Sequence, residues 1–492
     1  MRLRVAILSL VLVHLHLVTA ASASNSSTSH NLFPTPSVLT GLETDEDLMP
    51  LRGGSGVAGT TGGDSKVGAY NYRPPQVPLD VKGYPVPHGL SLEQVHVYVR
   101  HGERTPVGVR LAPFIPEHWT MCKTRRQFPN AKDGEELPRS KRVVEKKDGT
   151  STEGLCLLGE LSDIGRQSTY NFGAALRSLY IDRLGFLADT LHNDDSVYFR
   201  STNMPRTIES LEQVIHGLYP TTKCAADALP TLLVRNGRDE NLLGNTLSCK
   251  RLEYLQIGFA QAAAAAYNQT LEPLDEKISK YLDGRPIRVD GKPRASGVLD
   301  TVKAAIAHGV KVPHEFEDKS VTDVIEQAVV NEWFAGYKTQ EVRRLGMGPL
   351  LSDLSQKLQR KVDRGANDPL KLLVHSTHDT ALAAMCNTLD VFDEKWPAFT
   401  ASITFELFKK IQPEENRSFL QTVFSPFQTS PAPEYFVRMR YQNRSLALPV
   451  CADEGKHLPG SPELCTLAAF RDRVKELTPV DWERECGSTG WS

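Results

Sequence analysis

The sequence predicts an α/β sandwich that carries an inserted α-helical cap. Three apolar strands, expected near 95–99, 196–200 and 370–374, are each followed by polar residues and then by a helical pattern. The stretch 236–355 lacks strand alternation and has a helical composition instead. Strands that alternate with helices build a sheet covered by helices, so the helical stretch is expected to be an insertion into the sandwich.

The N-terminal residues predict a secretory signal peptide over 1–23. Arg2 and Arg4 precede an apolar run that is short for a membrane span, and small residues suited to cleavage follow it. An uncleaved anchor is the alternative. Residues 24–85 are rich in Ser, Thr, Gly and Pro, which predicts a disordered linker. We therefore expect a protein that is secreted or lies in a vacuole- or lysosome-like lumen.

The remaining chain is expected to divide into two core segments, 86–235 and 356–492, separated by the cap at 236–355. Ser162 is a suitable N-cap for the helix that follows the first strand, because its hydroxyl can accept from a free backbone N–H. Two later strands with alternating apolar residues should form a meander, near 403–407 and 435–441.

Charge and cysteine content narrow the class of protein. The net charge of -2 gives no basic field for nucleic acid or anionic lipid, and no second apolar stretch approaches the ~20 residues of a membrane span. None of the eight cysteines has CxxC spacing, so we expect disulfides rather than zinc ribbons. Cys122 and Cys156 flank a long irregular stretch and could tie its ends together. Candidate glycosylation sequons lie at Asn25, Asn268, Asn416 and Asn443.

The chemistry is concentrated where the three strands end. The first strand continues into Arg100 and His101, the second into Arg200-Ser201-Thr202, and the third into a polar run that ends in His378-Asp379. Ligands of open α/β sheets bind at the carboxyl ends of strands, so these residues are expected to converge. Two fixed arginines beside a buried strand end require an anion between them, which predicts a phosphate pocket.

The residue types in this cluster fit phosphoryl transfer. Guanidinium groups of Arg100, Arg104 and Arg206 match phosphate oxygens, and a neutral imidazole of His101 can attack phosphorus. A protonated Asp379 can supply the proton that the leaving alkoxide needs. No metal-ligand motif, Walker loop or GxSxG elbow occurs in the sequence, so neither a cofactor nor a metal is expected.

Three motifs in this order resemble those of the histidine acid phosphatases, a branch of the histidine phosphatase superfamily. They are the RHGxRxP signature at 100–106, the RSTxxxRT motif at 200–207 and the His-Asp pair at 378–379. The resemblance covers roughly 90–490. It implies a three-layer α/β sandwich with a phosphoglycerate-mutase-like core and an α-helical cap.

The resemblance also implies a role for each site residue. His101 would be the nucleophile and Asp379 the proton donor, while phosphate would be bound by Arg100, Arg104, Arg206 and His378. The implied activity is that of a secreted acid phosphatase, which hydrolyses phosphate monoesters through a phosphohistidine intermediate. The expected partner is a small phosphate-ester substrate, and a homodimer stays open.

The same resemblance implies two disulfides, Cys249 with Cys486 and Cys451 with Cys465. Another bridge of the family has no counterpart, because no cysteine occurs in 399–408. Cys224 and Cys386 are therefore left without an assigned partner.

The sequence leaves several alternatives open. Arg200 and His375 are expected to support the site structurally rather than to contact phosphate. A mutase and a non-catalytic phosphate-binding protein are competing functions, and the secretory signal argues against the mutase. For the substrate, the segments 200–220 and 395–399 resemble the lysophosphatidic acid phosphatase type, whereas the secretory signal fits the prostatic, lysosomal or fungal secreted types better. Phytase-type specificity is a further alternative.

Overall fold

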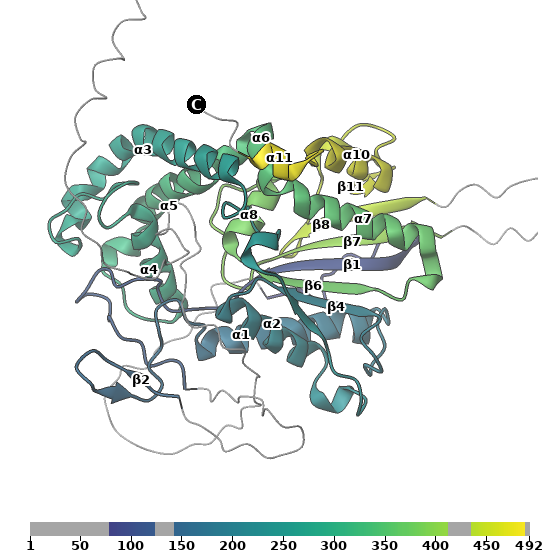
Figure 1. Cartoon of the computed structure of the whole chain (residues 1–492), viewed down its shortest axis with the longest axis horizontal. Coiled ribbons are helices and arrows are strands. Elements are labelled where there is room, and N and C mark those ends of the chain that lie inside the picture. Colours follow the sequence, from purple (N-terminus) through teal and green to yellow (C-terminus); the bar gives the residue numbers. More distant parts are fainter. Residues whose placement is uncertain (1–77, 124–141, 412–433, 488–492) are drawn as a thin grey trace, which may run out of the picture. The chain divides into compact units, whose positions relative to one another are not determined.

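The computed structural model describes residues 78–123, 142–411 and 434–487 (Figure 1). The expected signal peptide at 1–23 and the sequons at Asn25 and Asn416 lie outside the described residues. The strands are β1 Leu90–Arg100, β2 Val144–Glu145, β3 Ser151–Thr152, β4 Val197–Ser201, β5 Leu232–Val234, β6 Leu372–Thr377, β7 Ser402–Lys410, β8 Tyr435–Tyr441, β9 Arg444–Leu446, β10 His457–Leu458 and β11 Ser461–Thr466. The helices are α1 Asp163–Arg177, α2 Pro205–Leu218, α3 Lys250–Ile278, α4 Ala295–Ala307, α5 Lys319–Phe334, α6 Gln340–Gly346, α7 Gly348–Arg364, α8 Asp379–Thr388, α10 Leu467–Leu477 and α11 Trp482–Cys486.

A mixed sheet forms the centre of the fold, with the strand order β10-β11-β8-β7-β1-β6-β4-β5. The four strands β1, β6, β4 and β5 are parallel, and β7, β8, β11 and β10 continue the sheet as antiparallel strands. The strands that carry the expected site are therefore immediate neighbours, with β6 between β1 and β4. The meander of β7 and β8 is confirmed.

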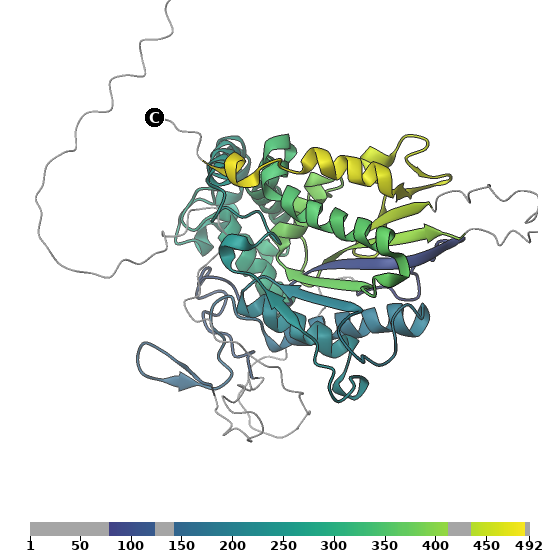
Figure 2. The same cartoon turned by 45° about the vertical axis from the view of Figure 1, so that its right-hand side comes forward.

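Helices cover both faces of this sheet, which confirms the sandwich (Figures 1 and 2). Successive side chains of a strand point to opposite faces. Val95, Val97 and Val99 of β1 accordingly pack in a cluster with residues of α1 and α2. Tyr98 packs on the other face, in a cluster with residues of α7, α8 and α10. Because both faces are covered, the second half of β1 is buried at successive positions and not only at alternate ones.

The cap has an apolar cluster of its own, formed mainly by α3, α4 and α5. Leu111, Ile115 and Trp119, from the stretch after β1, join this cluster. The leucines of α7 pack with the sheet instead, so this helix, which begins at Gly348, crosses the boundary expected at 355. The division of the chain into core and cap otherwise stays a prediction.

The third strand is shifted along the chain relative to the prediction. The sequence predicts it over 370–374, whereas β6 runs from Leu372 to Thr377 and is buried throughout. Polar side chains are tolerated there because they find backbone partners: Ser376 Oγ donates to Thr207 O over 2.8 Å, and Thr377 Oγ1 donates to Leu242 O over 2.8 Å. The sequence pattern alone cannot show such distant partners.

Residues 78–85, the last part of the stretch expected as a linker, belong to the described structure, whereas 24–77 lie outside it. Residues 78–85 lie against the folded body, where Tyr84 is buried and its hydroxyl donates to Glu406 Oε1 over 2.8 Å. Arg438 also pairs with Glu406 at 2.7 Å and donates to Pro85 O. The buried Tyr84 and these hydrogen bonds together hold the segment against the folded body.

Three disulfides are present: Cys122–Cys156, Cys249–Cys486 and Cys451–Cys465. All three expected pairs are therefore confirmed. The second joins the N-cap of α3 to the end of α11. Cys224 and Cys386 are not disulfide-bonded.

Candidate active site

The three strand ends converge as predicted. The backbone N–H of His101, just after β1, donates to Thr377 O of β6 over 2.9 Å. The N–H of Thr202, just after β4, donates to Ser376 O over 3.2 Å. Parallel neighbours end at the same edge of the sheet, so Arg100, His101 and Thr202 meet the His378-Asp379 pair there.

Two glycines allow helix α1 to approach the signature closely. A Cβ on Gly102 would lie 2.3 Å from Gly165 O, and a Cβ on Gly165 would lie 2.1 Å from Glu103 O. Either side chain would collide with backbone, so only glycine fits at these two positions. The same contact places Ser162 as the N-cap of α1, where its Oγ accepts from Gly165 N over 3.1 Å.

His101 is held in one tautomer. Its Nδ1 lies 2.9 Å from Gly102 O, and since a carbonyl only accepts, Nδ1 carries the proton. The lone pair of the neutral ring is therefore on Nε2. Burial, followed by the positive charges of Arg100, Arg206 and Arg104, holds the pKa of His101 well below its ordinary value. The ring stays neutral, and so nucleophilic, in acid.

Arg100 is fixed by three contacts. Its Nη2 pairs with Asp379 Oδ2 at 2.6 Å, and its Nη1 donates to Pro397 O over 2.7 Å. The guanidinium carbon also lies 4.0 Å from the ring centre of Phe399. A planar guanidinium can stack on a ring and donate to two separate acceptors at once, which a lysine cannot do, so the orientation of this cation is built into the fold.

The other two arginines complete the positive field. Arg104 pairs with Asp300 of α4 at 2.9 Å and lies 5.9 Å from the ring centre of Phe399. Arg206, in the first turn of α2, is buried and lowers the pKa of both His101 and His378. The structure thus brings three guanidinium groups close to the two histidines.

His378 lies beside the expected nucleophile, with the two ring centroids 5.6 Å apart. Its Nε2 is 3.0 Å from Thr202 Oγ1, which in turn is 2.8 Å from Thr207 Oγ1. Burial and then the charge of Arg206 lower the pKa of His378 to about 3. A bound phosphate would reverse this effect, because its negative charge favours the protonated ring.

Asp379 begins α8 and has partners on both carboxyl oxygens. Oδ1 accepts from Thr380 N over 2.8 Å, and Oδ2 accepts from Trp396 Nε1 over 2.9 Å in addition to Arg100. Burial alone would raise the pKa of Asp379, but Arg100, then Arg104 and the Trp396 hydrogen bond outweigh it. The pKa therefore lies below its ordinary value.

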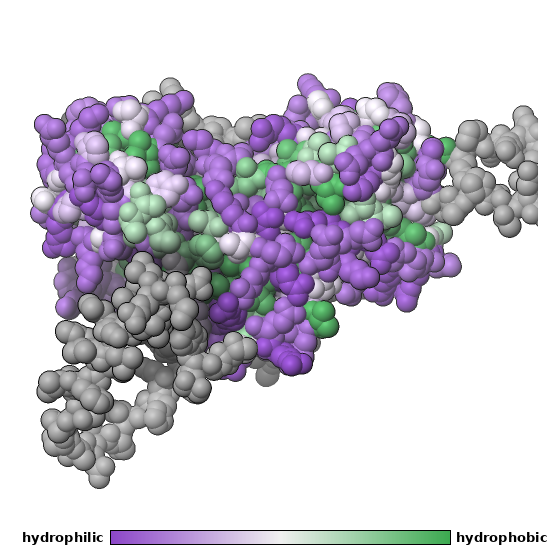
Figure 3. Space-filling model, turned by 90° about the horizontal axis from the view of Figure 1, so that it is seen from above, coloured by the Kyte–Doolittle hydropathy of each residue, from purple (hydrophilic) through white to green (hydrophobic). Residues whose placement is uncertain are grey.

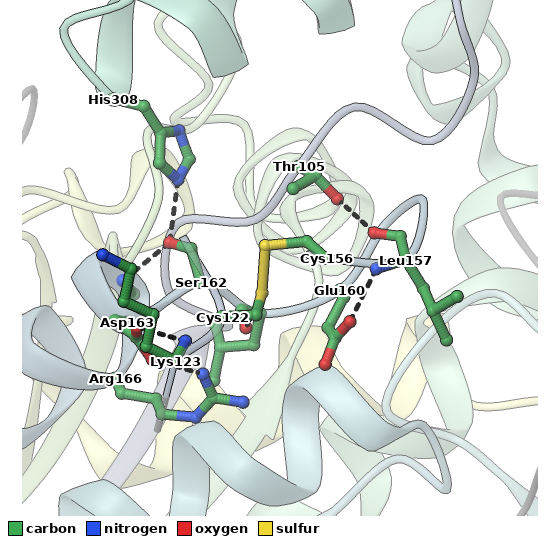
Figure 4. Close-up of a disulfide and its surroundings, with 12 residues drawn as sticks. Thr105, Cys122, Lys123, Cys156, Leu157, Glu160, Ser162, Asp163, Arg166 and His308 are labelled. Carbon is green, nitrogen blue, oxygen red and sulfur yellow. Dashed lines mark hydrogen bonds and ion pairs between the residues drawn. A yellow bond between two sulfur atoms is a disulfide. The ribbon is translucent and has the colours of Figure 1, made fainter. Parts of the chain in front are cut away.

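The chain after the signature is anchored by the Cys122–Cys156 disulfide (Figure 4). Thr105 Oγ1 donates to Leu157 O over 2.7 Å next to this bridge. On the other side, Ser162 Oγ lies 2.8 Å from Nε2 of His308, which caps α4. Cap, disulfide and helix α1 together hold the segment that follows Arg104.

The sequence analysis gives no role in the site to three residues of this cluster: Asp300, Trp396 and Phe399. Trp396 and Phe399 lie in the segment 395–399, whose resemblance concerns the substrate alone, and no motif marks Asp300. Arg200 is confirmed as structural, because it is buried in an ion pair with Glu240. His375 is likewise structural, since it is fully buried and stacks on Tyr98 with centroids 4.5 Å apart.

Both described sequon asparagines use their side-chain amides. Asn268 donates to Asp290 Oδ1 and accepts from Val289 N, each over 2.8 Å. Asn443 donates to Pro78 O and accepts from Asp80 N, each over 2.8 Å. Glycosylation at Asn268, Asn416 and Asn443 stays a prediction.

The face of the molecule seen in Figure 3 is mainly hydrophilic, with hydrophobic residues in small groups. Among the helices of the described ranges, none has the length and apolar character required to cross a membrane.

Comparison with known proteins agrees with this geometry. The model of the histidine phosphatase superfamily (branch 2) matches residues 91–440. A probable acid phosphatase of Schizosaccharomyces pombe is 35% identical over 449 residues, which cover 83% of this chain and 96% of the relative. The lysophosphatidic acid phosphatase type 6 of Homo sapiens is 28% identical over 416 residues, 81% of this chain and 87% of the relative.

Among solved structures, the apo form of the Hafnia alvei phytase superposes with a TM-score of 0.52 and 15% identity. The match covers 82% of this chain and 99% of that one, and it shows the shared fold. The family match spans the strand-end cluster from Arg100 to Asp379, so the chain belongs to branch 2 of the histidine phosphatase superfamily.

Proposed function

We propose that this phosphatase hydrolyses phosphate monoesters in acid through a phosphohistidine formed on His101. The observation that carries the proposal is the hydrogen bond from His101 Nδ1 to Gly102 O, which leaves the Nε2 lone pair free beside Arg100, Arg104 and Arg206. The family match and the relatives named acid phosphatases support this assignment.

In the first step, the His101 Nε2 lone pair forms a bond to phosphorus while the P–O bond to the leaving group breaks. Asp379 gives its proton to the departing oxygen, so the alcohol leaves neutral. In the second step, water attacks the phosphohistidine and passes a proton to Asp379. The P–N bond breaks, inorganic phosphate leaves and both side chains return to their starting states.

The cations stabilise the charge that spreads over the three non-bridging oxygens during transfer. Arg100, Arg104 and Arg206 would bind these oxygens, and a protonated His378 would add a further donor. Because fixed cations in a buried site do not have to reorganise, they stabilise the transition state at little cost.

Acid favours this mechanism through Asp379. In the free site, Arg100 stabilises the ionised carboxylate at 2.6 Å. A bound phosphate would share Arg100 and place negative charge beside Asp379, and both effects raise the pKa of that carboxyl. Substrate binding would therefore be coupled to protonation of Asp379, and activity should fall as this group loses its proton.

The proposed compartment is secreted or lumenal. The three disulfides support it, since such bonds persist in oxidising compartments, and the expected signal peptide supplies a route of export.

For the substrate, we propose a monophosphate such as lysophosphatidate before a polyphosphate such as phytate. The resemblance of 395–399 and the human relative named lysophosphatidic acid phosphatase support the former. Asp300 argues against the latter, because its carboxylate beside Arg104 would repel additional phosphate groups. Initial rates with an aryl phosphate, lysophosphatidate, phytate and a phosphotyrosine peptide would rank these classes.

The function is tested by phosphate release from p-nitrophenyl phosphate. We expect wild-type protein to be active at acidic pH and His101→Ala to lose activity by at least 10³-fold, because the nucleophile is gone. His314→Ala is the matched control, since the His314 side chain is 85% exposed. Equal rates for wild type and His101→Ala would contradict the proposal.

A further inference from the structure

Trp396 connects the cap to Asp379. Its indole Nε1–H donates to Asp379 Oδ2 over 2.9 Å, and its backbone N–H donates to Glu326 Oε1 over 2.7 Å. Glu326 belongs to α5 and also pairs with Lys303 of α4 at 3.1 Å. Trp396 thus joins α5 to the carboxyl group of the proposed proton donor, and Glu326 extends this link to α4.

The indole ring is held in place by aromatic neighbours. Trp333 meets it edge-on with centroids 6.0 Å apart, and Phe334 packs against it at 5.3 Å. The next residues contact the arginines: Pro397 O accepts from Arg100, and Phe399 lies under its guanidinium. The ring thus packs against two aromatic residues of α5, and the residues that follow it contact Arg100.

We propose that Trp396 is a positioning residue, which holds the carboxyl group of Asp379 in the orientation that protonates the leaving group. This inference rests on the proposed function. A terminal carboxyl rotates readily about its last torsion, so its direction has to be fixed by partners. The two partners on the side of Oδ2 are Trp396 and Arg100.

These two partners differ in what happens when substrate binds. Arg100 from β1, Arg104 from the segment after β1 and His378 just before α8 are the charged or titratable groups that face Asp379. All three would also bind the phosphate, whereas the indole N–H carries no charge and is already directed at Oδ2. Trp396 is therefore the contact on Oδ2 that would persist while the cations bind substrate.

The test is the pH dependence of kcat for Trp396→Phe with phenyl phosphate, a substrate whose leaving group needs a proton. A donor to the ionised carboxylate makes Asp379 a stronger acid. Its loss should move the decline of kcat at high pH upward by about one to two pH units, and should lower the maximum kcat. KM should change little, because Trp396 does not contact phosphate in this account.

Trp333→Phe is the matched control, because Trp333 packs on Trp396 while its own indole nitrogen has no hydrogen-bond partner. Trp333→Phe should leave the pH dependence of kcat unchanged.

If Trp396→Phe does not fold, Glu326→Ala tests the same link from the cap side and should shift the pH dependence of kcat in the same direction by less. A folded Trp396→Phe with an unshifted profile, or equal shifts in both tryptophan variants, would overturn the inference. Activity of wild type and its loss in His101→Ala show separately whether the proposed function holds.

Discussion

His101 and His378 lie side by side, yet their hydrogen bonds suit them to different tasks. His101 Nδ1 faces the carbonyl oxygen of Gly102, so the proton of the neutral ring is held on Nδ1. His378 Nε2 faces the hydroxyl of Thr202, which can donate or accept. The first ring is thus held as a nucleophile, while the second can gain a proton when an anion arrives. At the scale of residues, the carbonyl of Gly102 and the hydroxyl of Thr202 give the two histidines different roles.

Asp379→Asn should affect substrates according to their leaving group. Asparagine keeps the shape of the side chain but cannot give a proton, so phenyl phosphate should lose on the order of 10²–10⁴-fold in kcat. p-Nitrophenyl phosphate should lose much less, because its leaving group departs without protonation. Steady-state rates with both substrates check this, and equal losses would contradict the role of Asp379 as the acid.

At the scale of elements, cap helix α4 reaches the site through Asp300. One carboxylate oxygen pairs with Arg104 at 2.9 Å, and the other accepts from Val107 N over 3.0 Å. The helix therefore restrains both the arginine and the start of the segment that follows it. Because Asp300 is negative, it also competes with phosphate for the same guanidinium.

Asp300→Asn should consequently tighten the binding of inorganic phosphate. The amide can keep the hydrogen bond to Val107 N, while the repulsion between carboxylate and phosphate disappears. We expect the inhibition constant for phosphate to fall severalfold, and more at low ionic strength than at high. Asp323→Asn, on the exposed part of α5, is the control and should have no such effect. Weaker phosphate inhibition in Asp300→Asn would show that orientation of Arg104 outweighs charge.

Elements were predictable from the sequence where local patterns determine them. The alternating valines of β1, the Ser162 cap of α1 and the meander of β7 and β8 all follow from periodicity and capping. The extension of β6 through Thr377 could not be predicted from such patterns, because it depends on two distant acceptors, Thr207 O in α2 and Leu242 O. The short edge strands β5, β9 and β10 likewise carry too few residues for a pattern.

At the scale of the whole molecule, the described residues include five buried histidines with lowered pKa values: His96, His101, His308, His375 and His378. Burial is the largest cause in each, and the pKa falls to about 4 for His308 and about 3 for His378. In the unfolded chain these rings would protonate near pH 6.5. Below that pH the unfolded state binds more protons than the folded state.

The free energy of unfolding should therefore be highest above pH 6.5 and decrease as the pH falls toward 4. Each histidine contributes up to about 1.4 kcal/mol per pH unit in this window. Glu332 has the opposite effect and offsets the contribution of one histidine. Burial raises the pKa of Glu332 to about 7, so this carboxyl binds a proton in the folded state at a pH where it is ionised in the unfolded chain. Denaturant unfolding at pH 7, 6 and 5 measures the slope. Stability that is constant or rises on acidification would contradict the neutral state of these rings.

The site as a whole was predictable to the extent that its residues follow strands. Arg100, His101, Arg206, His378 and Asp379 carry motif signals at strand ends, and the structure brings them together. The residues that hold them come from the cap and from the chain after α8. Asp300 and Trp396 are far from the signature in the sequence and come close to the site only in the folded chain. Motif spacing therefore cannot identify them.

The central claim is a covalent phosphohistidine at His101, and trapping that intermediate tests it most directly. Wild-type protein should be mixed with ³²P-labelled p-nitrophenyl phosphate, quenched within milliseconds in alkali and digested. We expect label that is stable to base, labile to acid and confined to the peptide containing His101, with none in His101→Ala. Label on another residue, or hydrolysis that proceeds in His101→Ala without any labelled protein, would contradict it.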